Sequence, residues 1–467
     1  METCPNLIQD TNFNHQVQAE KEVVFVPFLQ AAFYLYLSAE LLSSMKGSLD
    51  KKDKIVIIGG GLMGSAAAWQ LAKEGNQVIL LEQQSEEYTS GSSFGEARIC
   101  RSLGPKHDIW SFLHKKSVAE AHELIEYLKK ADNSSHKMED IYSDSPVTYL
   151  LHTEKKNVVE RMLKQQEDPY ESSFTQEQAS SLFGMDVCHD EIVIKEEQQY
   201  TGTVNPKVLL SKLRIGIEKK GGEILYSTCA KDIKRTEDGY EIEIKTSKDL
   251  HEIWKVDRII LAAGPYTPHL LKGVSLQVSE EITPKRVFLA FLKINNKTYH
   301  RLDSSSQKKL IRSFPLIDLS DEHVFAMIEK IDEDGIPVFK IGGHFLRNEI
   351  DDLDKVWSQE LDQKEIDWSK EAFRSYLDKN RIKIDIDDIN FKSGYSCVYS
   401  LTDDEIPIVS PIIDNSGTKD PNFIVIGGLS GVGAKGALTY GLIATNLLLS
   451  RNEDSFMYKK TAHSLTF

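Results

Sequence analysis

A glycine-rich turn, GGGLMG, occupies residues 59–64 and joins two segments of different hydrophobic periodicity. The apolar residues 55–58 before it predict a buried parallel strand, and residues 65–72 after it predict a helix. A strand, a glycine-rich turn and a helix in this order are typical of a site that binds a dinucleotide. The helix N-terminus of such a unit offers unpaired backbone N–H groups to phosphates.

Three glycines of the turn have separate roles in such a site. Gly59 permits the tight turn, Gly61 lets the backbone approach a pyrophosphate, and Gly64 allows the helix to pack closely on the strand. A second strand at 77–81 ends in Glu82, eighteen residues after Gly64. This spacing is about the ~20 residues expected of a carboxylate that binds a ribose hydroxyl. The cofactor-binding residues predicted here are Gly59, Gly61, Leu62, Met63, Gly64 and Glu82.

The composition excludes several kinds of partner. With 467 residues, of which 40% are hydrophobic and 27% charged, the chain is typical of a globular protein of two or three domains. Its formal net charge of −15 provides no basic field for phosphates, so we expect no nucleic-acid partner. The five cysteines are scattered without a CxxC pair or a Cys/His cluster, so we expect neither a disulfide framework nor a metal site. The cytoplasm, a reducing compartment, is the simplest location.

Residues 23–42 are predominantly apolar and have about the ~20 residues that a membrane-spanning helix needs. Four lysines follow closely and would place the rest of the chain on the cytoplasmic side of a membrane. Gln30 and Glu40 oppose a span, because polar groups are costly in hydrocarbon. Three alternatives therefore stand for residues 1–52: a membrane anchor, a helix docked on the domain surface, or an upstream extension before a start at Met45.

Strand–turn–helix patterns occur at both ends of the chain, with a different kind of sheet between them. Near the C-terminus, the apolar residues 423–426 lead into a glycine-rich segment at 427–433 and a predicted helix at 434–448. A third apolar strand at 258–261 ends in a small-residue turn at Gly264, where backbone can approach a bound nucleotide. The segments that predict antiparallel strands are residues 287–292, 323–328 and 337–341. Residues 132–200 are charged and mixed, and we expect a less regular segment there.

These motifs resemble a known family, the flavin-dependent amine oxidases of the monomeric sarcosine oxidase, pipecolate oxidase and N-methyl amino acid oxidase group, within the D-amino acid oxidase-like superfamily. The resemblance covers roughly residues 53–450. Residues 59–64 with Glu82 resemble the FAD-adenosine site of the family. Gly91-Ser92-Ser93, followed by Arg98 and Arg101, is similar to its flavin-contacting loop.

Three further motifs come later in the chain. KIGGH, at 340–344, resembles the strand that bears the oxygen-activating lysine of the family, here Lys340. SCVY, at 396–399, resembles the segment where a cysteine thioether holds the flavin, here Cys397. Residues 428–435 resemble the closing loop, whose lysine, here Lys435, faces the substrate carboxylate. The remaining candidates from these motifs are Ser92, Ser93, His344, Tyr399, Gly428, Gly431 and Gly433.

The chain departs from the family pattern at two positions near the expected flavin. Phe94 and Val432 stand where the family usually has histidines, which affects the expected substrate more than the chemistry. The C-terminal residues Leu465-Thr466-Phe467 also differ from the peroxisomal signal of animal relatives.

The resemblance implies oxidation of a secondary or N-methyl amino acid, sarcosine-like or pipecolate-like, to an imine, with dioxygen reduced to hydrogen peroxide. FAD would be bound covalently through Cys397, and Lys340 would activate oxygen. Arg101 and Lys435 would hold the substrate carboxylate, and Arg98 would stabilise negative charge on the reduced ring. His344 and Tyr399 would contact the substrate. Four converging cations in an acidic protein predict a small anionic substrate.

We therefore expect a two-lobed α/β fold, with a Rossmann-like FAD lobe and a mainly antiparallel substrate lobe, in a monomer. The FAD lobe is predicted at 53–130, 201–275 and 391–467, and the substrate lobe at 131–200 and 276–390. Two alternatives stay open for the function: a membrane-tethered dehydrogenase that passes electrons to a quinone, and a flavin-binding protein without turnover that acts through partners.

Overall fold

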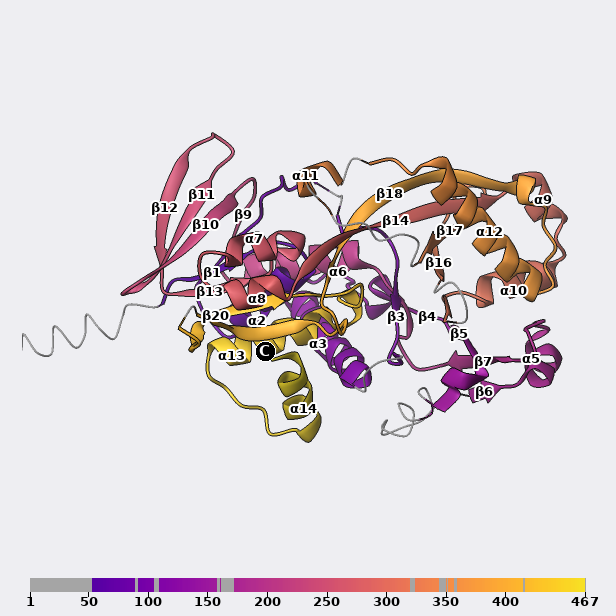
Figure 1. The fold of residues 1–467 in the computed structure, drawn as a ribbon, viewed down its shortest axis with the longest axis horizontal. Helices are drawn as coiled ribbons and strands as arrows, with labels where there is room; N and C mark the ends of the chain where they lie inside the picture. The colour runs from indigo at the N-terminus through magenta and orange to yellow at the C-terminus, as the bar shows by residue number, and fades with distance from the viewer. Residues whose placement is uncertain are drawn as a thin grey trace, which may run out of the picture. The chain divides into compact units, whose positions relative to one another are not determined.

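The computed structural model describes most of the chain from residue 53 onward (Figure 1). The described residues are 53–88, 91–104, 109–157, 160, 172–319, 324–343, 350, 352–356, 359–414 and 416–466. The apolar segment 23–42 and His344 lie outside them. Among the described helices, none is both long and apolar enough to cross a bilayer.

A six-stranded, mainly parallel sheet carries the glycine-rich turn. In spatial order its strands are β19 (Ile408–Ile413), β20 (Lys419–Gly427), β13 (Arg258–Leu261), β1 (Ile55–Ile58), β2 (Val78–Leu81) and β9 (Glu223–Leu225). β1 lies between β13 and β2 and is parallel to both, while the edge strand β19 is antiparallel to β20. All four residues of β1 are buried, which explains their uninterrupted apolar sequence. The Rossmann-like lobe predicted from the sequence is confirmed.

The two faces of this sheet are covered by different elements. Ile55 and Ile57 pack in a core with helices α2 (Leu62–Lys73), α3 (Ile109–Asp132), α6 (Pro206–Lys219) and α13 (Ala437–Leu448). Val56 and Ile58 pack in a second core with α7 (Thr267–Leu271), α8 (Leu276–Glu280) and a three-stranded antiparallel sheet. That small sheet consists of β10 (Cys229–Thr236), β11 (Gly239–Lys245) and β12 (His251–Val256).

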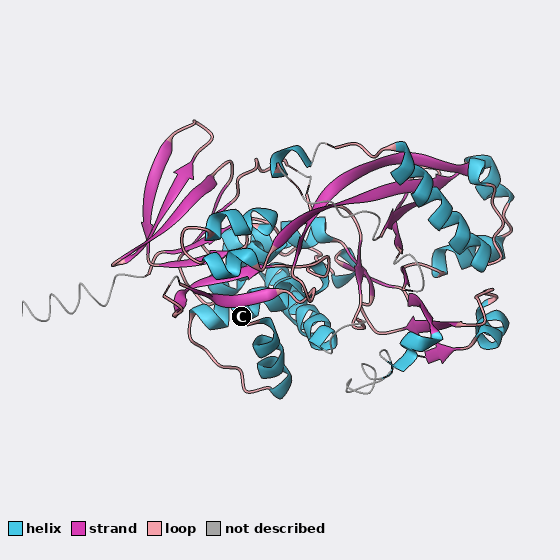
Figure 2. Cartoon of the chain, viewed as in Figure 1, coloured by secondary structure: helices cyan, strands magenta, loops and turns pink. Residues whose placement is uncertain are grey.

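An eight-stranded sheet forms the other large part of the fold (Figure 2). In spatial order its strands are β18 (Ile389–Leu401), β14 (Thr283–Ile294), β17 (Pro337–Gly342), β16 (Phe325–Ile331), β15 (Leu316–Asp318), β5 (Val147–His152), β7 (Glu191–Glu196) and β6 (Ser172–Phe174). The pairs are antiparallel except β15 with β5. Helix α12 (Gln363–Lys379) packs on β14, β17 and β18.

The expectation of a less regular segment at 132–200 is wrong. β5, β7 and β6 come from this segment and enter the large sheet, because Val147 to Leu151 form a buried strand despite the charged residues around them. The same sheet includes β18, although residues 391–401 fall in the segment predicted for the FAD lobe. A further three-stranded sheet, with β3 (Arg98–Cys100), β8 (Gly202–Val204) and β4 (Tyr142–Asp144), carries Arg98.

Candidate active site

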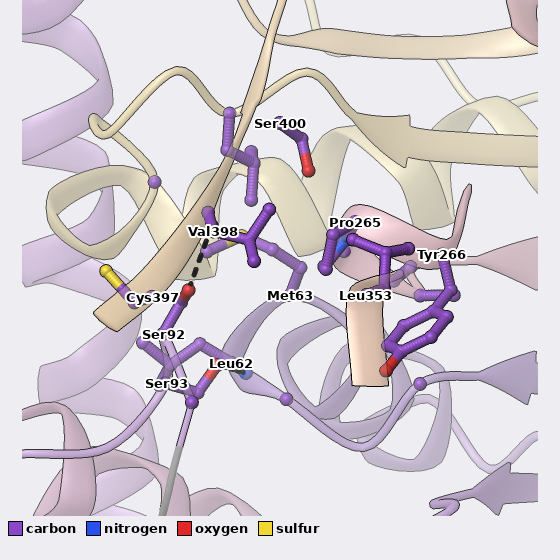
Figure 3. A pocket seen from close by; sticks show the side chains of 18 of the residues that line it. Leu62, Met63, Ser92, Ser93, Pro265, Tyr266, Leu353, Cys397, Val398 and Ser400 are labelled. Atoms are coloured by element: carbon purple, nitrogen blue, oxygen red, sulfur yellow. Dashed lines mark hydrogen bonds between the residues drawn. The ribbon is translucent and has the colours of Figure 1, made fainter. Parts of the chain in front are cut away.

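A cavity of about 720 Å³ lies where segments from the whole described chain meet. Figure 3 shows side chains that line it from several elements, among them Leu62 and Met63 at the start of α2 and Cys397 on β18. The Ser92 hydroxyl donates a hydrogen bond to the Val398 carbonyl oxygen, 3.3 Å away, and so joins the 91–94 loop to β18. The predicted residues on the wall are Gly59, Gly61, Leu62, Met63, Glu82, Ser92, Ser93, Arg98, Gly264, Lys340, Cys397, Tyr399, Gly431 and Gly433.

The glycine-rich turn is shaped as a dinucleotide site requires. Gly59 has φ +106°, and a Cβ there would lie 2.4 Å from the Ala262 carbonyl oxygen. At Gly64 a Cβ would lie 1.9 Å from the Gly59 carbonyl oxygen, so only glycine lets α2 begin this close to β1. Gly61 is the N-cap of α2 and has no side chain to cap the helix, and the Leu62 N–H donates to the Ser93 hydroxyl, 3.0 Å away, on the cavity wall.

Glu82 follows β2 and lines the same end of the cavity. Its carboxylate accepts hydrogen bonds from the backbone N–H groups of Gly60, at 3.0 Å, and Gln84, at 2.9 Å. Burial raises the pKa of Glu82, while these N–H groups and Arg214 oppose that shift. Since each carboxylate oxygen can accept more than one hydrogen bond, Glu82 can still accept from a ribose hydroxyl.

Arg214 is a cavity residue that the sequence analysis missed. Its guanidinium donates to the Gly60 carbonyl oxygen, 3.0 Å away, and lies 5.1 Å from the centre of the Tyr226 ring. Its Nε is buried and has no hydrogen-bond partner among the described atoms. In a sequence that predicts a helix, nothing distinguishes an arginine that faces a nucleotide from one that faces solvent.

At the other end of the cavity, Cys397 and Arg98 lie close together. The Cys397 side chain is buried, and burial raises the pKa of its thiol to about 11 against the opposing effects of Arg98 and Lys340. The Arg98 guanidinium donates to the carbonyl oxygens of Ala97, at 2.9 Å, and Phe94, at 2.5 Å. It also donates to the Tyr395 hydroxyl, 3.2 Å away. These contacts fix Arg98 beside the thiol.

Lys340 is fully buried in the middle of β17. Its ammonium donates to the Ala97 carbonyl oxygen, 2.7 Å away, forms an ion pair with Glu329 and lies 5.6 Å from the centre of the Phe291 ring. Burial and, to a smaller extent, Arg98 lower the pKa of Lys340 to about 7, and Glu329 opposes the shift. Such a lysine can exchange a proton near neutral pH. Sequence analysis did not identify Glu329.

Arg101 and Lys435 are brought near each other but are not among the residues that line the cavity. The Lys435 ammonium lies 4.4 Å from the centre of the Trp110 ring and has no hydrogen-bond partner among the described atoms. Burial and, next, Arg101 hold the pKa of Lys435 well below its usual range. Arg101 donates to the Leu103 carbonyl oxygen. Gly64 and Gly428, which the sequence also predicted to bind the cofactor, are not among the residues that line the cavity and pack against other protein atoms instead.

The two positions that depart from the family pattern lie in different surroundings. Phe94 lines the cavity, with its ring centre 6.2 Å from that of Tyr88. Val432 packs against the core of the six-stranded sheet and is not among the lining residues. Phe94 is therefore the departure that bears directly on what the cavity admits.

Comparison with known proteins identifies the family. The model of a family described as "FAD dependent oxidoreductase" matches residues 54–447. The chain belongs to this family. It is 23% identical over 410 residues to "Probable sarcosine oxidase" of Arabidopsis thaliana, covering 87% of this chain and 90% of the relative. It is 23% identical over 413 residues to "Peroxisomal sarcosine oxidase" of Mus musculus, covering 84% and 91%.

Solved structures of this fold align along most of the chain. The open form of NikD, an amino acid oxidase of nikkomycin biosynthesis, has a TM-score of 0.64 at 16% identity and covers 89% of this chain and 97% of its own. Glycine oxidase from Geobacillus kaustophilus has a TM-score of 0.62 at 14% identity and covers 86% and 96%. The family match and the structural alignments thus confirm the family and the fold expected from the sequence. The close turn at Gly59 and the Glu82 carboxylate at the end of β2 fit a dinucleotide.

Proposed function

We propose that this FAD-dependent oxidoreductase oxidises a small secondary or N-methylated amino acid to an imine and passes the electrons to dioxygen. The observation that carries the proposal is that Cys397, Arg98 and Lys340, from three separate strands, reach one cavity that begins at Gly59. Bound FAD would supply the hydride acceptor for the amine and the electrons for dioxygen. Sarcosine-like and cyclic imino acids are the leading substrates.

The chain would hold the cofactor from both ends of the cavity. The N-terminus of α2 would face the pyrophosphate, Glu82 would accept from the ribose, and Arg214 would donate to the nucleotide. At the flavin end, Cys397 would hold the cofactor through a thioether to a ring methyl group. Formation of this bond would release two electrons and two protons, which dioxygen would accept as hydrogen peroxide. Arg98 and Lys340 support the step, because both favour the thiolate of Cys397.

The role of Arg101 and Lys435 in binding the substrate carboxylate stays a prediction, because neither is among the residues that line the cavity. The buried Lys435 ammonium lacks a hydrogen-bond partner among the described atoms, and a carboxylate would supply one and restore its charge. Tyr399 lines the cavity beside the Gly431 loop and would contact the substrate. The corresponding role for His344 stays a prediction. Phe94, in place of a histidine, makes this part of the wall apolar, which favours a substrate with an aliphatic N-substituent.

Lys340 would act in the oxygen step. The first electron transfer to dioxygen creates superoxide, and a nearby ammonium in a partly dry site stabilises that charge. Lys340 is fully buried on the cavity wall, so its charge is weakly screened. This role favours dioxygen over a quinone as the acceptor.

The test measures flavin content and peroxide yield. We expect the purified holoenzyme to be yellow and to release nearly one hydrogen peroxide for each sarcosine or pipecolate consumed. A protein that stays colourless after FAD addition would contradict the proposal. Turnover of the amino acid with a soluble quinone but without peroxide would favour the dehydrogenase instead. The monomeric state and the cytoplasmic location stay predictions.

A further inference from the structure

Glu329 occupies an irregular position in the strand next to Lys340. β16 and β17 are antiparallel, with Ile328 opposite Phe339 and Lys330 opposite Val338. Glu329 is therefore the extra residue of a β-bulge. Bulges often occur beside active sites, where the extra residue turns a side chain away from the regular alternation.

The Glu329 carboxylate organises the groups around Lys340. Its Oε2 forms the ion pair with the Lys340 ammonium and accepts the Ala97 N–H at 3.2 Å. Its Oε1 accepts the Glu96 N–H at 2.7 Å. The carbonyl oxygen of Ala97 in turn accepts hydrogen bonds from both Lys340 and Arg98. Glu329 thus fixes the backbone segment that positions both cations.

The two partners of this ion pair line different cavities. Lys340 lines the cavity assigned to FAD, and Glu329 lines a second hollow of about 620 Å³. The Glu329 side chain is 8% exposed, whereas the Lys340 side chain is fully buried. Charged side chains that also line the second hollow are Lys293, Lys330, Asp332, Glu333, Asp334 and Lys392. The carboxylate is therefore the group of the pair that solvent can reach.

We propose that Glu329 is a positioning residue that keeps Lys340 protonated and returns a proton to it from the second hollow during dioxygen reduction. This inference rests on the oxygen-activating role proposed for Lys340. The other groups that face the Lys340 ammonium are Arg98, from β3, which disfavours its charge, and Cys397, from β18, whose thiolate would favour it. Between turnovers the Glu329 carboxylate supplies the negative charge beside this ammonium.

The proton balance explains why such a carboxylate is useful. Reduction of dioxygen to hydrogen peroxide takes up two electrons and two protons. The reduced cofactor supplies both electrons and one proton, so one proton comes from solvent. Lys340 would donate this proton to the reduced oxygen, and Glu329, protonated from the hollow, would return one to the Lys340 amine.

The test uses the holoenzyme reduced by light under anaerobic conditions, so that no amino acid substrate is needed. Its reoxidation by dioxygen is followed by absorbance from pH 5.5 to 9.5 in wild type and in Glu329→Gln. Loss of the Glu329 anion lowers the pKa of Lys340. The rate of reoxidation falls as Lys340 loses its proton, so in Glu329→Gln this fall should occur at lower pH. A shift of one unit reduces the protonated fraction about tenfold above both pKa values, and we expect a rate loss of about that size at pH 8.

A second readout is independent of dioxygen. The midpoint potential of bound FAD is measured against pH, where ionisation of Lys340 gives a break in slope. The break should move down by about one unit in Glu329→Gln and disappear in Lys340→Met. Asp334→Asn is the matched control, because Asp334 lines the same hollow and pairs with Lys293 at 3.0 Å. It should leave both profiles unchanged.

The outcomes separate this inference from the proposed function. A break at the same pH in wild type and Glu329→Gln overturns the positioning role. If the reduced wild-type enzyme reacts with dioxygen no faster than free reduced FAD, the proposed oxidase function is contradicted. The pH at which the slope of the midpoint potential changes would still test whether Glu329 pairs with Lys340. The return of the proton is tested with Glu329→Ala. Formate that enters the second hollow can replace the missing carboxylate, so added formate should restore the rate of reoxidation. No recovery with formate overturns that step.

Discussion

Gly59 and Cys397 line the same cavity although they lie 338 positions apart in the chain. Gly59 directly follows β1, an inner strand of the six-stranded sheet, and Cys397 lies in β18, an edge strand of the eight-stranded sheet. A cofactor that contacts both therefore joins the two sheets. Binding of FAD should stabilise the fold, because a ligand that binds only the folded state adds to its free energy of unfolding.

Gly59→Ala should abolish FAD binding. The new Cβ would lie 2.4 Å from the Ala262 carbonyl oxygen, so the turn must open where the pyrophosphate binds. Gly75→Ala is the matched control, since Gly75 also has positive φ, +82°, but open space around it. Both variants place alanine at positive φ, which costs about 1–3 kcal/mol of backbone strain in each. The ratio of flavin absorbance to protein should fall only in Gly59→Ala, and equal ratios would contradict the assigned turn.

Cys397→Ala should release the flavin on acid precipitation. In wild type the yellow colour should stay with the pellet, and in the variant it should move to the supernatant. Cys229→Ala is the control, because Cys229 lines the same cavity among residues that flank the predicted adenosine site. A colourless pellet in wild type would remove Cys397 from the covalent scheme while leaving FAD binding intact.

Lys435→Met should raise the KM for the amino acid by about tenfold to a hundredfold, the equivalent of a charge-assisted hydrogen bond of about 1.5–3 kcal/mol. Methionine fills a similar volume and can keep the contact with Trp110, and removal of a buried ammonium that has no hydrogen-bond partner among the described atoms should not destabilise the fold. Lys212→Met is the control for a buried lysine remote from the reaction, paired with Asp140 at 3.2 Å. An unchanged KM in Lys435→Met would refute the carboxylate role.

The local parts of the fold were predictable from the sequence, and the parts set by long-range pairing were not. The strand at 55–58, its turn and the helix after it follow from neighbouring residues, and the structure confirms them. β5 enters the large sheet by pairing with β15, about 170 residues later, and a mixed local sequence gives no sign of that partner. Because the residues around Val147 to Leu151 are charged, the local sequence did not predict a buried strand there.

The candidate site shows the same division. Cys397 and Lys340 were identified by motif, but the partner of Lys340 was not, because Glu329 reaches it through a bulge that no alternating pattern predicts. Tyr395 could have been found: it lies two residues before Cys397 in a strand, and a period of two places both on one face. Its hydroxyl accepts a hydrogen bond from Arg98 at 3.2 Å.

The lowered pKa of Lys340 predicts how stability depends on pH. The pKa is about 7 in the folded protein against 10.5 for an ordinary lysine. Between these values the unfolded chain binds more protons than the folded chain, so the free energy of unfolding rises with pH. One such group contributes at most about 1.4 kcal/mol per pH unit.

This contribution is best measured from pH 7 to 9, because Cys397, whose pKa is raised to about 11 from 9.0, opposes it above pH 9. Urea unfolding of the apoprotein should give a rising free energy in wild type. In Lys340→Met the slope should be smaller by about 1 kcal/mol per pH unit. Lys212→Met again serves as the control and should keep the wild-type slope. If Lys340→Met and wild type have parallel profiles, the Lys340 ammonium is not destabilised by burial, and the proton exchange inferred for it near neutral pH fails as well.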